Sequence, residues 1–287
     1  MVFGNGHGHG LGLGASLRYD GVVWTDPEVE DRLERLEIPF GPRGIDPYGA
    51  SRKELGLFMS LLGLLYKRYF QVRVHGVENV PQRGRAMLVG NHQGGVALDG
   101  AMVIASMFFE MEPPRLAQGM AEKFIYMLPF ASEWATRCGQ LSGLPEHAER
   151  LLQDERILMV FPEGARGTAK LYWERHSLVH FGTGFMRLAL ATGTPIVPFA
   201  FLGGGEAIPT VMNLYRIGKL LGAPYIPVTP WLLPVPRRVP LDIYYGEPMH
   251  FTGSETEEDA VIEGYVDQVK DRIAHMIEDG ERERGER

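Results

Sequence analysis

Residues 86–99 read AMLVGNHQGGVALD, and this stretch decides the fold. The apolar run at 86–90 has the length and composition of a buried strand, and the glycine pair at 94–95 marks a turn. A second run, ILMVFPEGARG at 157–167, also leads from apolar residues into a turn with proline and glycine. Buried strands that pass through glycine turns into helical segments are typical of a parallel sheet.

The same alternation extends outward from these two runs along most of the chain. Predicted strands cover residues 70–75, 87–91, 116–120, 139–142, 157–161, 196–201 and 241–245. Predicted helices cover residues 50–70, 98–111, 124–137, 146–153, 185–192 and 256–277. We therefore predict an α/β fold in which helices flank a mostly parallel central sheet, with an apolar helix near the N-terminus.

Composition indicates one globular domain. The chain has 287 residues, of which 45% are hydrophobic and 23% charged, as in ordinary globular proteins. We expect a Gly-rich, partly disordered arm at 1–47, a single domain at 48–280 and a charged tail at 281–287. The single cysteine, Cys138, excludes an internal disulfide and fits a reducing compartment.

Two apolar segments indicate contact with a membrane. In the predicted helix at 50–70, residues 55–66 are apolar almost all round, but they span only about 18 Å, too short to cross a bilayer. Lys67 and Arg68 at its end would meet lipid phosphates. The alternative is an ordinary core helix.

The second segment is the Pro-rich stretch 208–238. Between Leu220 and Pro236 it has no charge, and its five prolines exclude a regular helix. Trp231, with Lys219 and Arg237 on the flanks, suits a membrane interface; the alternative is a long loop that covers the core.

Net charge and the search for targeting signals limit where in the cell we expect the protein. A net charge of −7 argues against nucleic acid as a partner. We find neither a signal peptide nor a run of about 18 apolar residues. We therefore expect the protein at the cytoplasmic face of a membrane, bound to anionic lipid.

The first candidate site joins His92 to Asp99. His92 follows a strand, and Asp99 stands where a helix should begin, so the turn between them can bring the carboxylate to the imidazole. Such a pair fixes one ring nitrogen as a donor and leaves the other as a base. An isolated histidine is more often structural, but the nearby carboxylate favours catalysis.

The second candidate site follows the strand at 157–161. The turn presents Glu163 and Arg166, and Arg166 with Lys170 can cradle a phosphate or another polar headgroup. The alternative is a surface ion pair between Glu163 and Arg166 of little energetic value.

Together these motifs resemble the lysophospholipid (1-acylglycerol-3-phosphate) acyltransferases and their acylglycerol-acylating relatives. Asn91-His92 with Asp99 is similar to that family's first block, residues 161–166 to its third, and Ile196-Val197-Pro198 to its fourth. The resemblance covers about residues 70–250 and implies a fold like that of glycerol-3-phosphate acyltransferase.

The resemblance implies a mechanism. His92, oriented by Asp99, takes a proton from an acceptor hydroxyl, whose oxygen attacks the thioester of acyl-coenzyme A or acyl carrier protein. Amides at Gly94 and Gly95 are candidates for stabilising the oxyanion. No cofactor is bound permanently and no metal is required. The expected substrate-binding residues are Asn91, Gly94, Gly95, Glu163, Gly164, Arg166, Lys170 and Pro198.

Three departures from the family pattern concern the site: the first decides whether Asp99 reaches His92 across a longer turn, and the other two concern the acceptor. Six residues separate His92 from Asp99 where the family has four, and Ala165 and Gly167 replace two hydroxyl residues. The second block, at 139–143, lacks the family's arginine. Fewer phosphate donors favour mono- or diacylglycerol over lysophosphatidic acid as the acceptor.

Two other classes of function stay open at this point. His92 and Asp99 with His176 or His180 could hold a metal and activate water, as in a metal-dependent lipid hydrolase. A non-catalytic lipid-binding protein would need the apolar segments but not His92.

Overall fold

The computed structural model describes residues 25–95, 97–121, 131–142 and 144–285. The described strands of the main sheet are β1 (Arg73–His75), β2 (Ala86–Gly90), β3 (Ala117–Ala121), β4 (Leu141–Ser142), β5 (Ile157–Val160), β6 (Ile196–Leu202) and β9 (Asp242–Tyr245). The longer described helices are α1 (Pro27–Arg35), α2 (Arg52–Leu64), α3 (Leu98–Glu110), α4 (Ala131–Arg137), α5 (Pro145–Gln153), α7 (Gly184–Thr192) and α10 (Asp259–Arg284).

The described strands form a seven-stranded sheet in the order β1-β9-β6-β2-β5-β3-β4. Neighbouring strands are parallel except for β6 and β9, which are antiparallel. Val89 of β2 lies opposite Val160 of β5 and Pro198 of β6. The carboxyl ends of these three strands therefore meet at one edge of the sheet, where side chains that follow them can converge.

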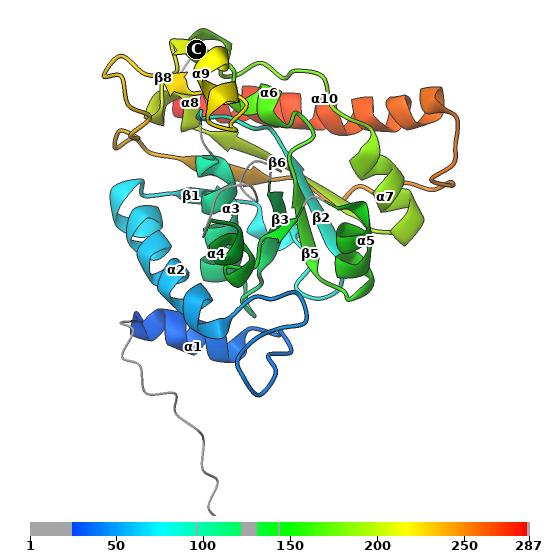
Figure 1. Ribbon diagram of the computed structural model, residues 1–287. Helices are drawn as coiled ribbons and strands as arrows, with labels where there is room; N and C mark the ends of the chain where they lie inside the picture. The colour runs from blue at the N-terminus through cyan, green and yellow to red at the C-terminus, as the bar shows by residue number, and fades with distance from the viewer. Residues whose placement is uncertain (1–24, 96, 122–130, 143, 286–287) are drawn as a thin grey trace, which may run out of the picture.

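Helices cover both faces of the sheet (Figure 1). Successive residues of β2 alternate between two hydrophobic clusters, because side chains of a strand point to opposite faces. Leu88 packs in the cluster that includes residues of α1, α2 and α3. Met87 packs in the cluster that includes residues of α5, α7 and α10. The predicted α/β fold with a mostly parallel sheet between helices is confirmed.

The ends of the chain differ from the prediction. Residues 1–24, 286 and 287 lie outside the described residues, as do 124–130 of the predicted helix 124–137. Within the predicted arm, however, α1 buries Val29 and Leu33 in the core, so the folded domain begins before residue 48. The last helix continues to Arg284 rather than ending at 277, and Gly285 ends it in the left-handed conformation.

The apolar helix near the N-terminus is α2, which continues into a π-helical turn, η1 (Leu65–Tyr69). Met59 and Tyr66 are buried in the core, whereas Leu61 and Leu65 are about half exposed, at 52% and 44%. In the part of the chain that the structure describes, no helix combines the length and apolar character that crossing a bilayer requires.

The Pro-rich segment forms an extension that we call the flap (residues 208–238). It contains the short helix α9 (Tyr215–Leu220) and a two-stranded ladder of β7 (Met212–Asn213) with β8 (Pro227–Val228). The rest of the flap is irregular, as its prolines require. It lies at the same end of the molecule as the short helices α6 (Ala165–Thr168) and α8 (Gly204–Ala207) (Figure 1).

Candidate active site

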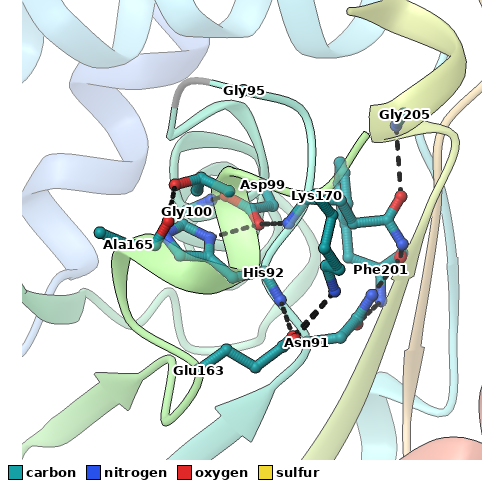
Figure 2. A network of polar contacts seen from close by, with 12 residues as sticks. Asn91, His92, Gly95, Asp99, Gly100, Glu163, Ala165, Lys170, Phe201 and Gly205 are labelled. Carbon is teal, nitrogen blue, oxygen red and sulfur yellow. Dashed lines mark hydrogen bonds and ion pairs between the residues drawn. The ribbon is translucent and has the colours of Figure 1, made fainter. Parts of the chain in front are cut away.

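Two buried amides after β2 fix the start of the candidate site to the neighbouring strand. The Asn91 side chain donates to the Phe201 carbonyl at 2.9 Å and accepts from the Phe201 amide at 2.7 Å. Gln93 donates to the same carbonyl at 2.8 Å and accepts from the Gly205 amide at 3.2 Å. These bonds hold the backbone on both sides of His92 against β6 (Figure 2).

The glycine pair then turns the chain back toward His92. Gly94 and Gly95 have φ angles of 92° and 65°, which glycine adopts without the cost that a side chain would add. Beyond the turn, α3 places Asp99 in its first turn. The longer spacing between His92 and Asp99 is therefore accommodated, and Asp99 Oδ2 lies 2.6 Å from His92 Nδ1.

Asp99 is surrounded by hydrogen-bond donors. It is completely buried, and it accepts the Gln93 amide at 2.8 Å and the Gly100 amide at 2.8 Å. The positive end of the α3 dipole adds to these bonds. These contacts hold the Asp99 side chain in one orientation, aimed at the ring of His92.

The bond to Asp99 determines what the His92 ring can do. A carboxylate can only accept, so Nδ1 carries the proton and donates it to Asp99, which leaves Nε2 of the neutral ring as an acceptor. Within the described part of the chain Nε2 has no hydrogen-bond partner, and the side chain is 11% exposed. The ring stacks on Phe161 with centroids 4.1 Å apart. This arrangement can take a proton from a hydroxyl group.

A buried ion pair supports the backbone of His92. Glu163 Oε1 accepts the His92 amide at 2.8 Å, and Lys170 lies 3.1 Å from Oε1 and 2.9 Å from Oε2. Glu163 Oε2 also accepts the Val179 amide, and Lys170 also donates to the Ser177 carbonyl at 2.9 Å. Glu163 is therefore paired with Lys170 rather than with Arg166. All three protons of the Lys170 ammonium have acceptors within the protein.

The turn after Glu163 brings α6 close to His92. Gly164 has a φ of 56°, and at Gly167 an added Cβ would lie 2.7 Å from the His92 Cβ. A residue larger than glycine at 167 would thus push on the His92 side chain. Arg166 is exposed, and it forms no ion pair with any residue that the structure describes.

The remaining predicted residue, Pro198, is buried within β6, inside the sheet rather than at the edge that carries His92. The predicted contacts of Pro198, Asn91, Lys170 and the other substrate-binding residues with a substrate stay predictions. No group of three or more His, Cys, Asp or Glu side chains suited to a metal occurs among the described residues.

The sequence interpretation missed Tyr225 of the flap. Its hydroxyl, which is buried, donates to the Gly95 carbonyl at 3.2 Å and is hydrogen-bonded to the Thr168 hydroxyl. It therefore joins the flap to both the glycine turn and α6. Tyr225 is the single tyrosine of the uncharged, Pro-rich stretch 220–236, which is a usable signal because a buried tyrosine hydroxyl needs a partner.

Comparison with known proteins agrees with this geometry. The family model described as Acyltransferase matches residues 71–202, the segment that contains His92, Asp99 and Glu163. The chain is similar to the uncharacterized protein Rv0502 of Mycobacterium tuberculosis, at 32% identity over 82% of this chain and 67% of the relative. It is also similar to the human "DGAT1/2-independent enzyme synthesizing storage lipids", at 24% identity over 73% of this chain and 61% of the relative.

The fold is also shared with a solved structure, the 1-acyl-sn-glycerophosphate (LPA) acyltransferase PlsC from Thermotoga maritima. The TM-score is 0.53 at 17% sequence identity, over 79% of this chain and 81% of that chain. The architecture, the matched segment and the relatives lead to one conclusion. The chain belongs to the acyltransferase superfamily.

Proposed function

We propose that the protein transfers a fatty acyl group from an acyl thioester to a hydroxyl group of a glycerolipid, with His92 as the general base. The observation that carries the proposal is the 2.6 Å contact between His92 Nδ1 and Asp99, which leaves Nε2 as an acceptor. The stack on Phe161 fixes the plane of the His92 ring, so that the lone pair of Nε2 points in one direction.

The reaction proceeds in two stages. Nε2 of His92 takes the proton of the acceptor hydroxyl as its oxygen attacks the thioester carbonyl. The imidazolium then returns the proton to the thiolate as the carbon–sulfur bond breaks. Asp99 stabilises the imidazolium between the two stages. Acyl-coenzyme A and acyl carrier protein both supply such a thioester, and amides of the glycine turn are candidates for holding the oxyanion.

We further propose a neutral acceptor such as mono- or diacylglycerol. Lys170 is occupied by Glu163 and Ser177, which leaves Arg166 as the exposed cation of the predicted phosphate-binding pair. The human relative is named for the synthesis of storage lipids, and this name supports the same choice. We expect the protein to act at the cytoplasmic face of a membrane, bound peripherally.

A panel of acceptors tests both parts of the proposal. Purified protein is incubated with acyl-coenzyme A and either lysophosphatidic acid, monoacylglycerol or diacylglycerol, and acyl transfer is followed by product formation. We expect faster transfer to the neutral acceptors, and loss of about 10⁴-fold in the His92→Ala variant because the base is removed. Preference for lysophosphatidic acid would refute the neutral acceptor alone. A His92→Ala variant with full activity would refute the mechanism.

A further inference from the structure

Two apolar segments that are far apart in the sequence meet at one place on the surface. The Tyr69 hydroxyl at the end of η1 donates to the Pro236 carbonyl of the flap at 2.8 Å. On the helix side the exposed apolar residues are Leu61, Leu64, Leu65 and Tyr69. On the flap side they are Val211, Met212, Tyr215, Ile217, Leu220, Leu221, Leu232, Leu233 and Val235. We call these two sets together the apolar surface.

The two segments that form the apolar surface contain cations but no carboxylates. The sequence has no Asp or Glu from Ala207 to Leu241, and none between Glu54 and Glu78. Arg68, Arg216, Lys219 and Arg238 are exposed there, and within the described chain none of the four pairs with a carboxylate.

Several cations elsewhere on the surface are neutralised by a neighbouring acidic side chain. Arg35, Arg83 and Arg187, for example, each pair with an acidic side chain. The chain as a whole carries a net charge of −7. A basic rim on an acidic protein, around exposed apolar side chains, is complementary to a bilayer with anionic headgroups.

The backbone at Leu232 adds an independent observation. Leu232 is 75% exposed and has a φ of 72°, a left-handed conformation that is costly for a leucine. Its amide donates to the Thr229 carbonyl at 2.9 Å, which holds the turn closed. Leu232 is therefore held exposed at the surface of the flap in a strained backbone conformation.

The inner side of the flap touches the catalytic turn. A Cβ added at Gly95 would lie 3.2 Å from Pro227 and 3.3 Å from Ile208, and Tyr225 bonds the Gly95 carbonyl. One side of the flap thus faces outward with its apolar residues, while the other packs against the turn that joins His92 to Asp99.

We infer that the apolar surface, formed jointly by the end of the α2–η1 helix and the flap, is the place where the protein docks on an anionic lipid bilayer. Docking there sets the catalytic turn next to the lipid phase from which the acceptor comes. That the docked protein takes its acceptor from the lipid phase rests on the proposed function, whereas binding of the bilayer does not.

Vesicle flotation tests the docking. The full chain is mixed with vesicles of phosphatidylcholine alone, or with phosphatidylglycerol added, and the bound fraction is measured. We expect binding that increases with phosphatidylglycerol. The triple variant Arg216→Gln, Lys219→Gln, Arg238→Gln should bind anionic vesicles about 100-fold more weakly, because each cation near such a surface contributes about fivefold.

A second variant separates docking from folding. Leu232→Asn removes the apolar side chain but suits the left-handed backbone, since asparagine adopts that conformation more readily. Its melting temperature should be no lower than that of the wild type, while vesicle binding falls about tenfold. Matched controls are Arg272→Gln and Val261→Ser, which change an exposed cation and an exposed apolar residue on α10. Both should bind like the wild type.

The outcomes distinguish the docking surface from the proposed acyl transfer. Wild-type protein that does not bind anionic vesicles, or variants that bind as well as the controls, would overturn the docking surface. Dimers that form in solution and dissociate in Leu232→Asn, without vesicle binding, would assign the surface to a second copy instead. Vesicle binding without acyl transfer to any acceptor would leave the docking surface in place and refute the proposed function.

Discussion

The described part of the chain contains two histidine–aspartate pairs, and they differ in what else the carboxylate binds. Asp99 accepts from His92 and from two backbone amides. Asp242 lies 3.4 Å from His75 Nε2, but it also binds Arg73 and Arg284. Burial alone would favour the neutral acid, yet the two arginines outweigh it and hold the pKa of Asp242 below its usual range.

The histidines differ accordingly. The side chain of His75 is 43% exposed and stacks on Tyr244, and its carboxylate is already neutralised by two cations. The side chain of His92 is 11% exposed and is the sole protonatable partner of Asp99 among the described residues. A histidine beside an aspartate is therefore not in itself a catalytic pair; what matters is whether the carboxylate is free to stabilise the imidazolium. The following variants test this difference.

Removing the charge of Asp99 should have the largest effect of these variants. In Asp99→Asn the amide can donate to Nδ1, which would favour the tautomer with the proton on Nε2, where the base is needed. We expect kcat for acyl transfer to fall about 10³-fold. Circular dichroism and the melting temperature serve as the check on folding. Activity near that of the wild type would mean that the pairing of His92 with Asp99 matters no more for acyl transfer than the pairing of His75 with Asp242.

Gly167→Ala should have the next largest effect. The added methyl group would lie 2.7 Å from the Cβ of His92 and 2.8 Å from that of Glu163, so the ring must move relative to Asp99. Because displacement of a catalytic group is costly, we expect kcat to fall on the order of tenfold to 100-fold. Gly184→Ala is the matched control, since an added Cβ there has no atom within 4 Å. Equal activity in the two variants would contradict close packing of α6 on His92.

Tyr225→Phe should have a smaller effect. It removes the hydrogen bonds to Gly95 and Thr168 but keeps the ring that fills the space. A lost hydrogen bond of about 1 kcal/mol corresponds to about fivefold in kcat if it acts on the turn. Steady-state kinetics should place the loss in kcat rather than in the KM for the thioester. An unchanged kcat together with a lower melting temperature would assign Tyr225 to stability alone.

His75→Ala should have the smallest effect. His75 is half exposed and its removal leaves Asp242 paired with Arg73 and Arg284. We expect acyl transfer within about twofold of the wild type, because changes at exposed positions are usually tolerated. A loss comparable to that of Asp99→Asn would mean that pairing with an aspartate, not the surroundings of the carboxylate, marks the catalytic histidine.

The sequence predicted the sheet and the His92–Asp99 contact because both depend on local patterns. Buried strands of four to seven residues and a glycine turn can be recognised directly in the sequence. The partner of Glu163 was not predictable in the same way. Arg166 is closer to it in sequence, but Arg166 is exposed on the short helix α6, whereas Lys170, two residues after that helix, is buried against Glu163. Which cation reaches the carboxylate depends on the path of a turn rather than on spacing.

Contacts between segments that are far apart in the chain could not be predicted from the sequence either. The bond from Tyr225 to Gly95 and the bond from Tyr69 to Pro236 join residues that no periodicity relates. Each apolar segment was recognised by its composition, but only the folded chain places them on one surface. Helix α1 was missed altogether because Val29 and Leu33 are too few apolar residues to stand out beside the Gly-rich start.

A double-mutant cycle on acyl transfer tests the central claim most directly. The kcat/KM values of His92→Ala, Asp99→Asn and the double variant are compared with that of the wild type. If Asp99 acts only through the ring of His92, the double variant is no slower than His92→Ala alone, because the losses of residues that act as a unit do not add. Losses that multiply would show that the two residues act separately, and would contradict the account.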